Sequence, residues 1–98
     1  MITQDEVKQI AEALTVAEGQ VLLEVRDSQG WTVKSLGEIA EDTCMSINTV
    51  RRTIKSLREK NLVELIRLTQ DEYDHTLCGS GYARTYAGDR VATEISQS

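Results

Sequence analysis

Hydrophobic residues in the first half of the chain recur every three or four positions, which is the spacing of helices that bury one face. The first such stretch contains Val7, Ile10 and Leu14. It follows Thr3, and an acidic residue three positions later completes a capping box, a pattern typical of helix starts. We therefore predict a helix over residues 4–14.

A second capping box, formed by Thr15 and Glu18, begins another run of helical spacing that continues to Arg26. Residues 27–30 contain turn formers and a glycine, which predict the end of this helix. The short aromatic and β-branched segment that follows, residues 31–33, favours a brief strand.

Two further amphipathic stretches are separated by a turn at residues 43–45, and Ser46 is a good N-cap for the second of them. Together they predict a helix-turn-helix over residues 35–60. The inward-facing positions are Leu36, Ile39 and Ala40 in the first helix and Val50, Ile54 and Leu57 in the second.

The last third of the chain favours strands and then a short helix. Asn61 is a typical left-handed helix stop, and residues 62–69 are rich in strand formers. Residues 82–87 can return as the antiparallel partner, so we predict a hairpin over residues 62–87. A terminal helix is expected over residues 89–95, capped by the glycine and aspartate that begin it.

The length of 98 residues suits one small domain spanning residues 1–98, mainly α with a small β-hairpin. No apolar run approaches the ~20 residues of a membrane helix, and the first residues lack the features of a secretory signal. We therefore expect a cytoplasmic protein without a membrane partner. Cys44 and Cys78 lack a paired spacing, so we expect thiols rather than a disulfide.

Positive charge is concentrated in one element of an acidic chain. The net charge is −5, yet residues 46–60 carry +4 and the remainder therefore −9. A solvated helix face is the simplest alternative, but such faces usually mix both signs, whereas here five cations meet one acid. The cations are Arg51, Arg52, Lys55, Arg58 and Lys60. An acidic body would repel DNA everywhere except at this helix, which would orient the approach.

Three segments, residues 36–40 (LGEIA), 46–52 (SINTVRR) and 57–63 (LREKNLV), resemble the winged helix-turn-helix transcriptional regulators of bacteria, archaea and their viruses. The resemblance covers residues 15–88. It implies a three-helix core plus a wing, with extra N- and C-terminal helices. It also implies that helix 47–59 enters the major groove of DNA, while the wing touches the adjacent backbone or minor groove.

The chemistry of the basic helix is consistent with this function. Residues at the N-terminal end of a major-groove helix reach base edges, where arginine can bind guanine, asparagine adenine, and Ile47 a thymine methyl group. Lys55 and Ser56 are better placed for phosphates. So are Lys34 and Ser35 at the start of the preceding helix, where free backbone N–H groups also favour an anion. The candidate DNA-binding residues are Lys34, Ser35, Ser46, Ile47, Asn48, Thr49, Arg51, Arg52, Lys55, Ser56 and Arg84.

Some features depart from the family pattern. Cys44 stands where these regulators usually place a glycine, and its Cβ disfavours a left-handed backbone by about 1 kcal/mol, so we expect a reshaped turn. The wing carries three acids between residues 71 and 74, which would repel phosphate. Cys44, His75 and Cys78 could form a metal or redox sensor, but they are one ligand short of a closed zinc site. We expect no metal and no cofactor.

The leading hypothesis is a sequence-specific double-stranded DNA-binding protein, a transcription regulator that acts as a homodimer. Residues 4–14 and 89–95 would form the dimer and place two basic helices ~34 Å apart. One alternative is a winged helix used as a protein–protein interaction module, and another is a plasmid or phage partition or replication protein. Neither a nucleophile elbow nor a glycine-rich phosphate loop is present, so we do not expect an enzyme.

Overall fold

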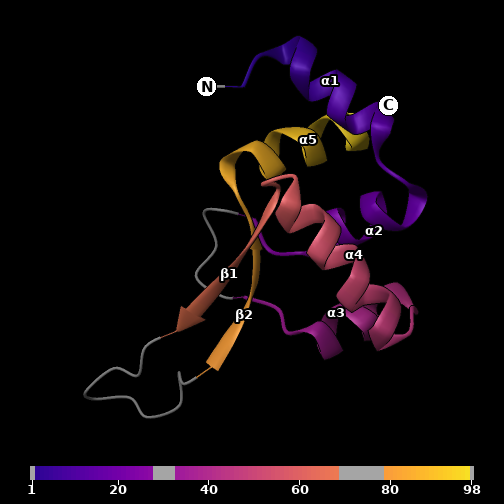
Figure 1. Cartoon of the computed structure of the whole chain (residues 1–98), viewed down its shortest axis with the longest axis vertical. Helices are drawn as coiled ribbons and strands as arrows, with labels where there is room; N and C mark the ends of the chain where they lie inside the picture. Colours follow the sequence, from indigo (N-terminus) through magenta and orange to yellow (C-terminus); the bar gives the residue numbers. More distant parts are fainter. Residues whose placement is uncertain (1, 28–32, 69–78, 98) are drawn as a thin grey trace.

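The computed structural model describes residues 2–27, 33–68 and 79–97, which form five α-helices and one β-hairpin (Figure 1). The elements are α1 (Gln4–Ala13), α2 (Val16–Glu24), α3 (Leu36–Thr43), α4 (Ile47–Glu59), β1 (Val63–Leu68), β2 (Gly79–Arg84) and α5 (Tyr86–Gln97). No helix within the described ranges is both long and apolar enough to cross a membrane.

The helices begin where the sequence supplies a side-chain cap. In α1 to α4, the cap hydroxyl accepts a hydrogen bond from the backbone N–H three residues further on. In α2 and α3 a glutamate also returns a bond to the cap N–H, which completes a capping box. The four caps are Thr3, Thr15, Ser35 and Ser46. The predicted starts of α1 to α4 are confirmed. The capping box predicted at Thr3 is not formed, because the Glu6 carboxylate accepts from the Thr3 hydroxyl instead.

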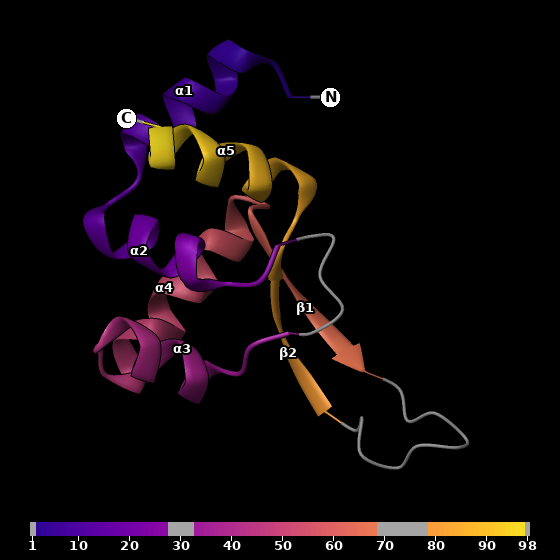
Figure 2. The same ribbon diagram turned by 180° about the vertical axis from the view of Figure 1, so that it is seen from behind.

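The helices form two layers around one apolar core. Helices α2, α3 and α4 pack on one another beside the base of the hairpin, and α1 and α5 lie side by side as a second layer (Figures 1 and 2). Both layers contribute to the core, which comprises Val7, Val21, Leu22, Val25, Ile39, Val50, Ile54, Leu57, Leu62, Val63, Val91 and Ala92.

The hairpin is antiparallel, with Val63 opposite Arg84 at its base. Its second strand is also tied to the segment that leads into α3, because Tyr82 and Lys34 exchange two backbone hydrogen bonds of 3.3 and 2.8 Å. Gly81 makes this approach possible, since a Cβ there would lie 2.5 Å from the Val33 side chain. The orientation of the wing is thus coupled to the start of the helix-turn-helix.

The terminal helix begins at Tyr86, three residues before the predicted start, so the prediction of a strand continuing to residue 87 was wrong. The cap is Thr85, whose Oγ1 accepts a hydrogen bond of 3.0 Å from the N–H of Gly88. Gly88 lies inside the first turn of α5. A residue with a Cβ would not fit there, because the Cβ would lie 2.0 Å from the Leu62 carbonyl oxygen. This glycine serves close packing rather than capping.

Two other boundaries differ from the prediction. Helix α2 ends at Glu24, before the predicted Arg26, because Arg26 instead accepts a backbone hydrogen bond of 2.7 Å from Arg84 beside the second strand. The strand predicted at residues 31–33 falls largely outside the described residues, which resume at Val33.

The turn between α3 and α4 keeps a left-handed residue despite the absence of glycine. Cys44 has φ 58° and ψ 32°, and the N–H of Met45 donates to the Ala40 carbonyl at 3.1 Å. The expected reshaping of this turn was therefore wrong: the surrounding hydrogen bonds outweigh a backbone cost of about 1 kcal/mol. Asn61, with φ 61°, is confirmed as a left-handed helix stop.

Candidate nucleic-acid interface

Helix α4 has one buried side and one exposed side. Val50, Thr53, Ile54 and Leu57 are buried, and the Thr53 hydroxyl donates to the Thr49 carbonyl at 2.7 Å, so no polar group on this side lacks a partner. The helix is thereby held firmly against the core with its opposite side turned to solvent. That opposite side is the candidate interface.

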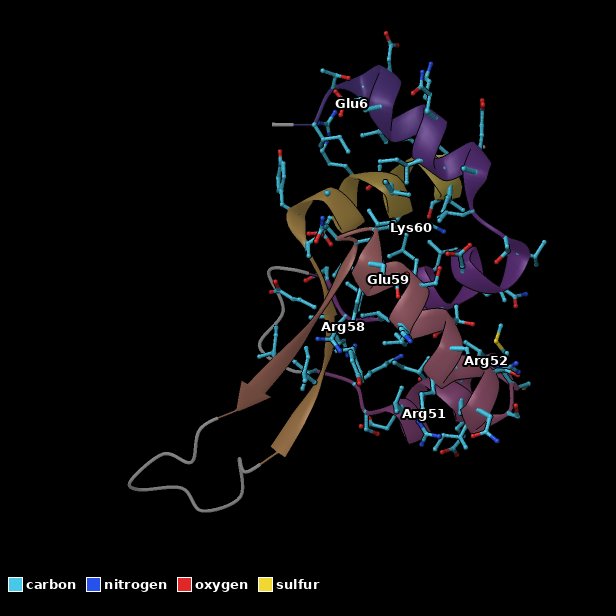
Figure 3. All side chains as sticks on the ribbon, in the orientation of Figure 1. Glu6, Arg51, Arg52, Arg58, Glu59 and Lys60 are labelled. Atoms are coloured by element: carbon cyan, nitrogen blue, oxygen red, sulfur yellow. The ribbon has the colours of Figure 1, made fainter. Side chains whose placement is uncertain are left out.

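The exposed side of α4 presents four cations, Arg51, Arg52, Lys55 and Arg58. Figure 3 shows Arg51 and Arg52 near the N-terminal end of the helix. Arg51 donates to the side chain of Asn48 at 3.1 Å. Within the part of the chain that the structure describes, the other three cations have no hydrogen-bond or ion-pair partner. We call these four residues the open cations.

The N-terminal end of α4 also places smaller side chains at the surface. Ile47 is 46% exposed, as the inward orientation of Val50 and Ile54 requires. Ser46 caps the helix by accepting the N–H of Thr49 at 3.2 Å, and its own hydroxyl donates to the Thr49 hydroxyl at 2.9 Å. The two hydroxyls are therefore engaged with each other, and Ile47 and Asn48 project beyond them.

Ser56 faces the protein interior rather than the exposed side of α4, which we call the open side. Its hydroxyl donates to Glu18 of α2 at 2.8 Å, and the ammonium group of Lys60 binds the same carboxylate. Only 7% of the Glu18 side chain is exposed. Burial alone would raise the pKa of this carboxyl, but hydrogen bonds from Lys60, the Thr15 backbone and Ser56 outweigh it and lower the pKa to about 2.

Lys34 is also committed to partners within the chain. Its ammonium nitrogen lies 2.7 Å from Asp42 and 3.5 Å from Glu24, and only 12% of the side chain is exposed. Ser35 caps α3, and its N–H is bound by the Glu38 carboxylate at 3.3 Å. The expected anion site at this helix start thus already holds carboxylates, which a phosphate would have to displace.

Arg84 connects the wing to the helical core. Its Nε lies 3.0 Å from Asp89 of α5, Nη1 donates to the Leu22 carbonyl of α2 at 3.1 Å, and the side chain is 16% exposed. The predicted DNA contact by Arg84 would require these bonds to break. The wing tip, including His75 and the acids at 71–74, lies outside the described residues.

These intrachain partners could be predicted from the sequence only in part. The capping box that contains Glu18 was recognisable, because it is local. Its bonds to Ser56 and Lys60 cross 38 and 42 residues of sequence, and no short motif marks them. The described residues contain no group of three or more His, Cys, Asp or Glu side chains suited to a metal. The predicted sensor set includes His75 and Cys78, which lie outside those residues.

The sequence matches no protein-family model, and no curated protein is similar enough to count as a relative. Solved structures are similar in fold. The transcriptional regulator SlyA has a TM-score of 0.65 at 23% identity over 94% of this chain and 58% of its own. A mutant S. aureus MepR bound to an oligodeoxyribonucleotide has a TM-score of 0.63 at 20% identity, over 95% of this chain and 67% of its own. The chain has the winged helix-turn-helix fold.

A third winged-helix structure has the same arrangement. The zinc-responsive MarR family member ZitR of Lactococcus lactis has a TM-score of 0.63 at 22% identity, over 95% of this chain and 68% of that protein. This chain therefore spans roughly six to seven tenths of the length of the three structures, from 58% to 68%. In the winged-helix arrangement, α3 and α4 are the helix-turn-helix and the β1–β2 hairpin is the wing.

Proposed function

We propose that this winged helix binds double-stranded DNA in a sequence-specific manner, with α4 in the major groove, and regulates transcription in the cytoplasm. The observation that carries the proposal is the set of open cations on a helix whose opposite side is buried. A rigid helix with one cationic, unobstructed side fits the ~12 Å major groove. The likeness to regulator structures, one of them bound to an oligodeoxyribonucleotide, supports the same function.

The open side divides into two parts with different tasks. Ile47, Asn48, Arg51 and Arg52 occupy the N-terminal end of α4, the end from which a major-groove helix reaches base edges. Lys55 lies one turn further along, where its ammonium group suits a phosphate. Arg58 near the C-terminal end extends the same cationic stripe. We therefore assign base reading to the first part and backbone contact to the second.

Homodimerisation is part of the proposal, and an apolar hollow at the junction of α1, α2 and α5 supports it. The hollow measures about 300 Å³, and its lining includes Leu14, Val16, Leu23 and Ile95. Val16 is 80% exposed and Leu23 is 41% exposed. Most other apolar residues of α1 and α5 already pack on the core. This junction is therefore the part of the α1–α5 layer that a second copy of the chain would cover.

Selection of bound sequences from a random duplex pool tests the proposal. The wild-type protein should enrich one motif, and a dimer should enrich it as an inverted repeat. Arg52→Ala should remove the preference within the motif, whereas Lys55→Ala should weaken binding to all sequences alike. Circular dichroism of both variants checks that they are folded. Identical binding of the two variants and the wild type to the selected site would contradict the proposal.

A further inference from the structure

We propose that Asn48 and Arg51 act as one guanine-reading unit, and that Asn48 does not read adenine by itself. This inference rests on the proposed DNA binding and specifies which base the N-terminal end of α4 prefers. Both side chains are exposed on the open side, three residues apart on α4 and therefore one above the other.

The hydrogen bond between the two side chains fixes the orientation of the amide. Nη1 of Arg51 donates to Oδ1 of Asn48 at 3.1 Å. A guanidinium group has only donors, so the amide atom that faces it has to be the oxygen. The amide NH₂ group of Asn48 is consequently left to point elsewhere, as a donor.

This orientation conflicts with adenine recognition. An asparagine that binds adenine uses its oxygen to accept from the N6 amino group and its NH₂ to donate to N7. Here one of the two lone pairs of the oxygen is engaged by Arg51, and an adenine amino group that used the other would lie beside the guanidinium N–H bound to the same oxygen. The guanidinium of Arg51 contributes its remaining N–H groups. The pair as a whole therefore offers several donors and a single remaining acceptor lone pair, on Oδ1 of Asn48.

Guanine is the base that matches a group in which donors predominate. Its major-groove edge carries two neighbouring acceptors, N7 and O6, whereas adenine and cytosine both place an amino donor there. An amino group that faces donors loses its hydrogen bond to water without a replacement, and this is the unfavourable case in desolvated contacts. The pair should thus select guanine and disfavour both amino-bearing edges.

The rest of the reading end supports the same preference. Glu59 is the only acid of α4 and lies at its C-terminal residue, far along the helix from Asn48. The hydroxyls of Ser46 and Thr49 are bonded to each other. The N-terminal end of α4 therefore presents no carboxylate, the acceptor that would best bind the amino group of cytosine.

The test compares wild type, Asn48→Ala, Arg51→Ala and the double variant. Each is used for selection from a random duplex pool and then for titration of the selected duplex against a copy in which the guanine pair is replaced by an adenine pair. The wild type should enrich guanine at a fixed position of each half-site and favour it by roughly tenfold or more over adenine. Arg51→Ala should reduce this ratio to near one.

The coupling between the two residues is the more specific readout. Asn48→Ala should lower the guanine-to-adenine ratio only in part. The double variant should behave like Arg51→Ala alone, because only the bond to Arg51 holds the Asn48 amide with its NH₂ group directed outward. Lys55→Ala is the control and should leave the ratio unchanged. Additive effects of the two substitutions would overturn the inference. So would enrichment of adenine that Asn48→Ala abolishes and Arg51→Ala preserves.

Failure of the inference is distinguishable from failure of the proposed function. If the wild-type protein enriches no sequence, DNA recognition itself is contradicted, and the base preference with it. If it enriches a motif that depends on Arg52 but lacks guanine at any position sensitive to Arg51, only the guanine-reading unit is contradicted.

Discussion

Two groups of cations in this protein differ in their surroundings rather than in their residue type. The open cations of α4 face solvent on one side of a single helix. Three other cations instead bind carboxylates within the chain. Lys34 binds Asp42 and Glu24, Lys60 binds Glu18, and Arg84 binds Asp89. Within a chain of net charge −5, one group of cations therefore stabilises the fold and the other is available to a partner.

The division predicts opposite sensitivities for the two groups. An exposed, unpaired side chain contributes little to folding, and its replacement usually changes stability by no more than about 0.5 kcal/mol. A cation bound to a buried carboxylate affects stability, because its removal leaves that carboxylate without its partner. DNA affinity should follow the reverse order.

Charge reversal in the open group should have the largest effect. Arg52→Glu should weaken binding to the selected duplex by roughly 30- to 100-fold, since it removes a base contact and adds repulsion from phosphates. Lys8→Glu makes the same change of charge at an exposed residue of α1 and should alter affinity less than about threefold. Fluorescence anisotropy at fixed salt measures both. Equal losses would mean that total charge, not the face of α4, governs binding.

Removing the buried partner of Lys60 should have the next largest effect. Glu18→Gln should lower the free energy of unfolding by about 2 kcal/mol at pH 7, because the buried side chain loses its charge-assisted bonds to Lys60 and Ser56. Glu59→Gln, at an exposed position of α4, is the control and should cost less than about 0.5 kcal/mol. Urea denaturation measures the difference.

The same substitution gives a pH signature. The folded state lowers the pKa of Glu18 from 4.5 to about 2, so the stabilisation by Glu18 is complete above pH 4.5 and declines as the pH falls toward 2. The stability difference between wild type and Glu18→Gln should therefore shrink between pH 5 and pH 2. A difference that stays constant over that range would contradict the account of this carboxylate.

Neutralising one lysine from each group gives a smaller but closely matched contrast. Lys55→Gln should reduce the slope of log affinity against log salt by about 1 and leave stability nearly unchanged. Lys60→Gln should leave the slope unchanged and lower the free energy of unfolding by about 1 kcal/mol. A change of slope in Lys60→Gln as large as that in Lys55→Gln would remove the distinction between the two groups.

The smallest predicted effect concerns the turn that positions the open group. Cys44→Gly should raise the free energy of unfolding by about 0.5 kcal/mol, because glycine adopts φ 58° without the Cβ penalty but loses more chain entropy on folding. Thermal unfolding measures the change, and DNA affinity should stay within twofold. A fall in stability would show that the Cys44 side chain contributes favourable contacts.

Local signals explain how much of this structure could be predicted. The caps Thr15, Ser35 and Ser46 and the stop at Asn61 depend on neighbouring residues only, and the amphipathic spacing of α4 identified its buried and exposed sides. The helix-turn-helix boundaries were therefore predictable. The identity of the open cations followed from the same periodicity.

The remaining features depend on contacts between distant residues. Lys60 binds Glu18 across 42 residues of sequence, and Arg84 binds the Leu22 carbonyl across 62. No local pattern therefore distinguished these two residues from the open cations. The close packing of Gly88 on Leu62 is also non-local, whereas the early start of α5 depends on the neighbouring cap Thr85. Such partners are set by the folded topology, whereas caps and helix faces are set by the adjacent sequence.

The salt dependence of wild-type binding tests the central claim most directly. The measurement is the affinity for a random-sequence duplex of about 30 base pairs from low to moderate salt. On random-sequence DNA all four open cations are expected to contact phosphates, so log affinity should fall linearly with log salt with a slope of roughly −3 to −4 per chain. No detectable binding at low salt, or a slope near zero, would contradict the account and favour a protein partner for this face.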